Sequence, residues 1–236
     1  MNKALNAELI SREIYKKALR EGLISNSDNA ARPAGTFAGE INRTLHEMLE
    51  KHPNLVLGGQ LIKYGFAGLT IGLYEKHPER FITYSVSEEL MNSSAMGLAL
   101  AGKRVVLFHV RLDFLLCGCN ALFNHIPIWW KKGYKLPITI IAQEGRGIGS
   151  GQGAQHSKDI TFWFSRFEGW NVCVPQTPQE AGDMLRESIE GNKPTLYTIH
   201  RRLFNAKEGT RVVTPEYIKL CGASQRHVKE FYGPDS

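Results

Sequence analysis

The chain has 236 residues, of which 42% are hydrophobic and 22% charged, as expected for a globular chain with one full domain and a sizeable core. No apolar run approaches the ~20 residues of a membrane span, and the first residues lack the apolar segment of a signal peptide, so we expect a cytoplasmic protein without a membrane partner. The net charge of +6 comes from scattered pairs such as Lys16-Lys17. The chain has no long basic run, and nucleic acid is not the partner we expect.

The N-terminal segment predicts an amphipathic helix followed by a linker, together residues 1–35. Apolar residues recur at helical spacing between residues 3 and 23, and residues 25–35 are rich in Ser, Asn, Asp and Gly. The helix could pack on a partner or on its own domain, and the sequence does not decide between them.

From residue 36 onward, predicted helices and strands alternate. Helices are expected at 36–51, 88–101, 115–124, 159–167 and 177–190. Apolar or β-branched runs predict strands at 54–60, 81–86, 105–110, 137–142, 171–175 and 194–200. Such alternation predicts an α/β fold with a mostly parallel sheet.

The segment from residue 81 to 110 predicts a strand, a helix and a second, parallel strand. In parallel sheets, ligands bind at the carboxyl ends of the strands, where Ser87 and Glu88 are expected to lie. Glu88 has two interpretations at this stage. It could complement the dipole of the helix that it opens, or it could bind a ligand.

A resemblance favours the second interpretation. Val86-Ser-Glu-Glu, together with the run from Ala95 to Gly102 (Ala-Met-Gly-Leu-Ala-Leu-Ala-Gly), resembles the Ile-Ser-Glu-(x)n-Gly-Ala-Ala-Met-Ala-Gly stretch of a thiamine diphosphate family. That family includes transketolases and the beta subunits of 2-oxo acid dehydrogenases. The resemblance covers residues 36–205 and implies a three-layer α/β sandwich, the pyrimidine-binding domain. It also implies that Glu88 is the glutamate that activates the cofactor.

The same resemblance assigns three further site residues. Phe114 matches the aromatic residue that stacks on the aminopyrimidine ring, and His156 matches the histidine of a glycine-rich segment ending in Gln-His-Ser, which faces the reacting carbon. Gln60 belongs to the cofactor-binding corner, where beta subunits have Gly-Glu-Glu and this chain has Gly58-Gly59-Gln60. Phe114 could instead be a core residue, and His156 could simply cap the following helix.

Two other interpretations of the sequence, a dinucleotide-binding motif and a cysteine metal site, are weaker. Gly149, Gly151 and Ala154 satisfy a loose dinucleotide-binding motif, but no helix opens there and no acidic ribose partner follows. Cys117 and Cys119 could bind a metal with His109 or His125, although the spacing is poor, and we expect buried, reduced cysteines. Whether Arg111 and Asp113 form an ion pair stays open.

The resemblance ends after residue 205, and residues 206–236 predict a tail with one short helix, where the family has a further domain. The chain also lacks the Gly-Asp-Gly…Asn signature that holds the divalent metal and the diphosphate. The resemblance therefore implies half of an enzyme. A separate alpha-like subunit would hold the diphosphate and Mg²⁺ in an α2β2 assembly that binds thiamine diphosphate at the shared interface, and no metal ligand is expected in this chain.

Such an enzyme would act on a ketone or a 2-oxo acid, by transketolase-like ketol or acyl transfer or by decarboxylation. Two alternatives remain. The chain could be a non-catalytic interaction or regulatory subunit that keeps the fold, for which Gly59, Gln60 and the short tail argue. It could also be an unrelated nucleotide-binding α/β domain that uses the glycine-rich segment.

Overall fold

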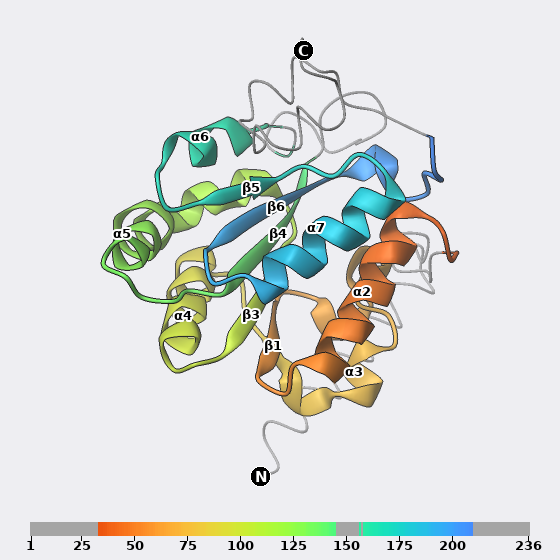
Figure 1. Cartoon of the computed structure of the whole chain (residues 1–236), viewed down its shortest axis with the longest axis horizontal. Helices are drawn as coiled ribbons and strands as arrows, with labels where there is room; N and C mark the ends of the chain where they lie inside the picture. The colour runs from red at the N-terminus through yellow and green to blue at the C-terminus, as the bar shows by residue number, and fades with distance from the viewer. Residues whose placement is uncertain (1–32, 145–155, 157, 210–236) are drawn as a thin grey trace.

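A computed structural model describes residues 33–144, 156 and 158–209, and its centre is a fully parallel six-stranded sheet of order β2-β1-β3-β4-β6-β5 (Figure 1). The strands are β1 (Leu55–Gly59), β2 (Phe81–Thr83), β3 (Arg104–His109), β4 (Ile138–Glu144), β5 (Asn171–Cys173) and β6 (Thr195–His200). The α/β class expected from the alternating pattern is confirmed.

Six α-helices accompany the sheet in the described part of the chain: α2 (Phe37–Lys51), α3 (Leu73–Lys76), α4 (Glu88–Leu100), α5 (Ile126–Lys131), α6 (Thr161–Arg166) and α7 (Pro178–Glu190). Short 3-10 turns cover Ile62–Tyr64, Phe66–Gly68, Pro78–Arg80 and Arg201–Leu203. The expected helix over 115–124 is instead a 3-10 segment, η5 (Leu112–Gly118), followed by a π-helical turn, η6 (Asn120–His125).

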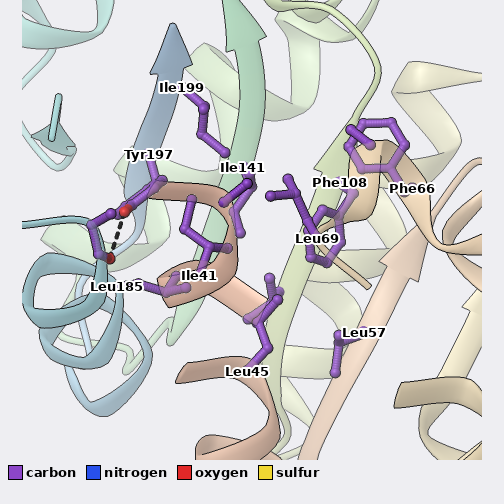
Figure 2. Close-up of a cluster of buried hydrophobic side chains, with 14 of the residues drawn as sticks. Ile41, Leu45, Leu57, Phe66, Leu69, Phe108, Ile141, Leu185, Tyr197 and Ile199 are labelled. Atoms are coloured by element: carbon purple, nitrogen blue, oxygen red, sulfur yellow. Dashed lines mark hydrogen bonds between the residues drawn. The ribbon is translucent and has the colours of Figure 1, made fainter. Parts of the chain in front are cut away.

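The two faces of the sheet carry separate cores, which makes the domain a three-layer sandwich. Helices α2 and α7 cover one face, where Ile41, Leu45 and Leu185 pack against Ile141 and Tyr197 (Figure 2). Buried Tyr197 donates its hydroxyl to the carbonyl oxygen of Ala181 in α7, at 2.6 Å. The central strands β1, β4 and β6 are buried along their whole length, as expected of parallel strands covered on both faces.

The second core lies under α4, α5 and α6. Its members are buried apolar residues of these helices and of the strands facing them, among them Met91, Ala95, Leu107, Ile140 and Phe164. Because this core fixes α4, Glu88, the first residue of the helix, has a defined position at the edge of the sheet.

Helix α7 begins with a variant of a capping box. Thr177 Oγ1 accepts the N–H of Glu180 at 3.2 Å, but the carboxylate of Glu180 accepts the N–H of Gln176 at 2.6 Å. In an ordinary capping box this carboxylate would bind the N–H of the N-cap, Thr177, whereas here it binds the N–H of the residue before it. The buried Glu180 thus provides an acceptor for the backbone N–H of Gln176.

The segment from 81 to 110 forms the expected parallel strand, helix and strand, but the two strands are not neighbours. Strand β1 lies between β2 and β3 and pairs with both in parallel. The expected N-terminal helix and linker and the helix of the C-terminal tail lie outside the described residues. Within the described ranges, no helix is long and apolar enough to cross a membrane.

Candidate functional site

Three of the expected site residues follow neighbouring strands at one edge of the sheet. Gln60 comes directly after β1, Glu88 opens α4 after β2, and Phe114 lies in η5 after β3. Because the sheet is parallel, these carboxyl ends share one edge, where ligands bind in open α/β sheets. All three side chains are partly exposed.

The two adjacent glutamates at the start of α4 have different surroundings. Glu89 accepts hydrogen bonds from Ser93 Oγ, Asn120 Nδ2 and the N–H of Ala121, each at 3.3 Å, so it ties α4 to η6. The partly exposed Glu88 carboxylate forms no hydrogen bond or ion pair with any described residue. It does not act as a side-chain cap of α4 in the described structure, and its oxygens are available to a ligand.

Glu88 is held in place through its backbone. A Cβ atom on Gly118 of η5 would lie 2.3 Å from Asn92 Nδ2 and 3.2 Å from the carbonyl carbon and oxygen of Glu88, so only glycine fits there without a shift. Asn92 Oδ1 in turn lies 2.9 Å from Nε2 of His109 at the end of β3. Burial lowers the pKa of His109 to about 3, so a neutral ring donates this bond. The first turn of α4 is thus fixed between η5 and β3.

The corner at the end of β1 is uncharged and closely packed. A Cβ on Gly59 would lie 2.7 Å from the carbonyl oxygen of Phe108, so this packing leaves no room for a side chain there. Gln60 points to α4, where its Nε2 donates to Met91 Sδ at 3.7 Å. Beta subunits have the acidic Gly-Glu-Glu at this corner. The packing around β1 in this chain fits Gly58-Gly59-Gln60 instead.

The structure brings Phe114 and His156 together. Their rings meet edge to face, with centroids 5.2 Å apart and planes at 83°. Next to Phe114, Asp113 is 5% exposed and accepts the backbone N–H of Lys158 at 2.9 Å. The Lys158 ammonium lies 3.8 Å from the same carboxylate oxygen. The chain around His156 is therefore attached to the end of β3.

Sequence reasoning missed the supporting residues of this site. It considered Asp113 only as a possible partner of Arg111, whereas Asp113 binds Lys158. It also missed the pair of Asn92 and His109; the available signal was that Asn92 lies one helical turn after Glu88. Long-range contacts of this kind leave no periodic trace in a sequence.

The cysteines do not form a metal site in the described ranges, where no group of three His, Cys, Asp or Glu side chains could hold a metal. Cys117 is exposed and Cys119 partly exposed, so the expectation that they are buried is wrong. Burial raises the pKa of Cys173 to about 11. Cys221 and the loose dinucleotide motif at Gly149, Gly151 and Ala154 lie outside the described residues.

The fold and the site define a parallel α/β domain. At the carboxyl edge of its sheet it presents an aromatic ring and a glutamate that has no partner among the described residues. The family model "Transketolase, pyrimidine binding domain" matches residues 36–207. The chain belongs to this family.

Its curated relatives include two beta subunits. Over 177 residues the chain is 26% identical to the acetoin:2,6-dichlorophenolindophenol oxidoreductase subunit beta of Cupriavidus necator, covering 70% of this chain and 52% of that protein. It is also 26% identical over 185 residues to the pyruvate dehydrogenase E1 component subunit beta of Chaetosphaeridium globosum, covering 77% and 56%. The chain thus spans about half the length of these relatives.

A solved structure has the same fold. A split gene transketolase, described as an inactive beta4 tetramer, superposes with a TM-score of 0.60 and 18% identity, over 77% of this chain and 55% of that one. The agreement confirms the transketolase-type pyrimidine-binding architecture.

Proposed function

We propose that the chain is the pyrimidine-domain subunit of a heteromeric thiamine diphosphate-dependent enzyme, with an N-terminal helix and linker (1–35), the pyrimidine-binding domain (36–205) and a tail (206–236). The observation that carries the proposal is the contrast between Glu88 and Glu89. Glu89 is occupied by three donors, while Glu88, placed at the carboxyl edge of the sheet, has no partner among the described residues.

The residues present fit the aminopyrimidine half of this cofactor, which is a flat ring with polar edges. The partly exposed ring of Phe114 offers an apolar face, and Glu88 and Gln60 offer polar groups at the neighbouring strand ends. When bound, thiamine diphosphate supplies a nucleophilic carbon for attack on a ketone or 2-oxo acid. Mg²⁺ and the diphosphate are assigned to an alpha-like partner in an α2β2 assembly, because the sequence lacks the Gly-Asp-Gly…Asn signature by which the family holds them.

With the cofactor bound, the Glu88 carboxyl group would hold the aminopyrimidine through a proton shared between its oxygen and a ring nitrogen, which is general acid–base chemistry. His156, in contact with Phe114, donates a hydrogen bond to the substrate oxygen on which negative charge develops. The reaction is ketol or acyl transfer or 2-oxo acid decarboxylation.

The first test is calorimetric titration with thiamine diphosphate and Mg²⁺, using the chain alone, the candidate diphosphate-binding subunit alone, and the two together. Binding by the pair only is the expected result. If the pair forms but does not bind the cofactor, the chain is a non-catalytic subunit that keeps the fold. The uncharged corner at Gly59 and Gln60 is the observation that favours this second candidate function.

The second test compares two adjacent glutamates in the assembled enzyme. Glu88→Gln should lower kcat by about 10²–10⁴-fold, the usual contribution of a general acid–base group. Glu89→Gln removes a charge one residue away, at a side chain already tied to η6, and should change kcat little. Equal activity of the two variants would contradict the role of Glu88.

A further inference from the structure

A cluster of lysine and aromatic side chains lies at the edge of the sheet opposite to Glu88 and Phe114. The turn after α5 leads into the start of β4, and Lys193 lies two residues before β6, so both belong to the amino ends of parallel strands. The backbone N–H of Leu136 donates to the carbonyl oxygen of Asn192 at 3.0 Å and joins the two segments. The cluster is therefore separate from the proposed cofactor edge.

Two of these lysines lie over tryptophan rings. Lys132 Nζ is 5.6 Å from the centroid of the Trp129 ring. Lys193 Nζ is 4.8 Å from the centroid of the Trp130 ring. Tyr134 packs against Trp129, with ring centroids 4.9 Å apart. Cation–π contacts of this kind hold an ammonium group in place and leave N–H donors that can bind another group.

Most of the positive charge in this cluster has no counter-charge within the described residues. Lys131 pairs with Glu168, at 2.5 Å. Lys132, Lys135 and Lys193 form no ion pair with any described residue. Lys193 is partly buried, and burial lowers its pKa, an effect that the charge of Glu168 opposes. A partly desolvated ammonium is stabilised when a carboxylate binds it.

The backbone that carries the cluster is fixed by hydrogen bonds. The N–H of Lys132 donates to the carbonyl oxygen of Ile128 at 3.1 Å. The N–H of Gly133 donates to the carbonyl oxygen of Trp130 at 2.9 Å, which closes the turn at the end of α5. Because this turn is already ordered in the chain, a partner that binds to it does not have to offset the entropy of ordering its backbone.

We propose that Lys132, Lys135 and Lys193 bind an acidic peptide segment of a protein partner. Each ammonium offers N–H donors to a carboxylate, and the unpaired positive charge attracts a negatively charged segment to this edge. Single-stranded nucleic acid is held by bases that stack on aromatic rings. Here a lysine already covers one face of Trp129 and one face of Trp130. The surface therefore fits carboxylates better than bases.

The test measures the fluorescence anisotropy of a labelled oligo-glutamate peptide of about ten residues, titrated with the full-length chain at low salt. We expect binding that weakens as salt is added, because the lysines are at least partly exposed. The double substitution Lys132→Gln and Lys193→Gln should lower the affinity about 3- to 30-fold, as expected for the loss of two exposed ion pairs. A wild-type chain that does not bind the peptide would overturn the proposal.

The matched control is the double substitution Lys76→Gln and Lys207→Gln. Both lysines are exposed, and their replacement lowers the net charge of the chain by the same amount. Lys76 ends α3, which packs into the core on the other face of the sheet, and Lys207 follows Ala206 of that core. The control should keep the wild-type affinity. Equal weakening in the two double variants would show that the attraction depends on net charge alone, which would overturn the proposal.

Two further titrations distinguish the class of partner. They use an oligothymidylate of similar charge and vesicles of phosphatidylcholine with phosphatidylserine. If either binds more tightly than the peptide and loses affinity in the Lys132→Gln and Lys193→Gln chain, the surface does not select an acidic protein segment and the proposal is wrong. These measurements need neither thiamine diphosphate nor a second subunit, so their outcome is independent of the proposed function.

Discussion

Gly118 is the residue whose lack of a side chain matters most for Glu88. Gly118→Ala would place a Cβ 2.3 Å from Asn92 Nδ2 and 3.2 Å from the Glu88 carbonyl, so the start of α4 must shift. We expect a loss of about 1–3 kcal/mol in the free energy of unfolding, the usual cost of overpacking, measured by urea denaturation.

Gly97 provides the matched control for this substitution. It lies inside α4, and a Cβ there would meet nothing within 4 Å. Gly97→Ala should therefore stabilise the chain by about 0.5–1 kcal/mol through helix propensity. If both variants lost stability equally, the contact of Gly118 with α4 would not be the cause.

His109 gives the domain a pH-dependent stability. Burial lowers its pKa from the ordinary 6.5 to about 3, so the unfolded chain binds a proton below pH 6.5 that the folded chain does not take up until about pH 3. The contribution of neutral His109 to the free energy of unfolding is therefore full above pH 6.5 and decreases as the pH falls toward 3. Between pH 7 and pH 5 the loss should be about 2 kcal/mol.

Urea denaturation at the two pH values checks this contribution. His109→Gln keeps a donor for Asn92 and removes the titration, so its stability should fall by about 2 kcal/mol less than that of the wild type over the same range. His125→Gln, at an exposed histidine, should preserve the wild-type difference. An equal loss of unfolding free energy between pH 7 and pH 5 in the wild type and both variants would contradict the assignment to His109.

At the scale of elements, the cap of α7 can be tested by itself. Thr177→Ala removes the acceptor of the Glu180 N–H, which is buried and bound at 3.2 Å. We expect a loss of about 1 kcal/mol, within the range for N-cap substitutions. Thr177→Ser keeps the hydroxyl and should stay near the wild-type midpoint in urea, and a drop as large as that of Thr177→Ala would indicate lost methyl packing instead.

Elements with a clear period were predictable from the sequence. The spacing of Ile41, Leu45 and Met48 places α2 (Phe37–Lys51), and the continuous apolar run after Pro137 places β4. The order of strands could not be read in this way, since the insertion of β1 between β2 and β3 depends on contacts distant in sequence. For the same reason η5 and η6 were expected to be ordinary helix: their form depends on packing against α4.

Within the site, the resemblance to the thiamine diphosphate family led to Gln60, Glu88, Phe114 and His156, whose roles stay predictions. The structure adds that Phe114 and His156 touch, and that Glu88 and Glu89 differ in their partners. The sequence could not separate the two glutamates, because both fit the first turn of a helix. Only the donors of η6, which reach Glu89 from more than thirty residues away, distinguish them.

At the scale of the whole molecule, exposed apolar side chains gather in the segments around the proposed cofactor edge. Val86 is 80% exposed, and Leu90 and Leu61 are 53% and 49% exposed. Val86 and Leu90 flank Glu88 by two residues on either side, and Leu61 follows Gln60. Since the proposed function places a second subunit over Glu88, we expect these three side chains to be covered by the diphosphate-binding partner.

Leu90→Glu tests this interface. The side chain is half exposed, so the substitution should change the free energy of unfolding of the isolated chain by no more than about 0.5 kcal/mol, while a charge buried at the interface should weaken assembly by about tenfold or more. Sedimentation of the mixed subunits measures the affinity. Leu100→Glu is the matched control, because Leu100 is 39% exposed on the same helix but lies ten residues, about 15 Å, further along it.

Equal weakening of assembly by both substitutions would mean that the partner does not lie over Glu88. An unchanged affinity for Leu90→Glu would place the partner elsewhere on the molecule.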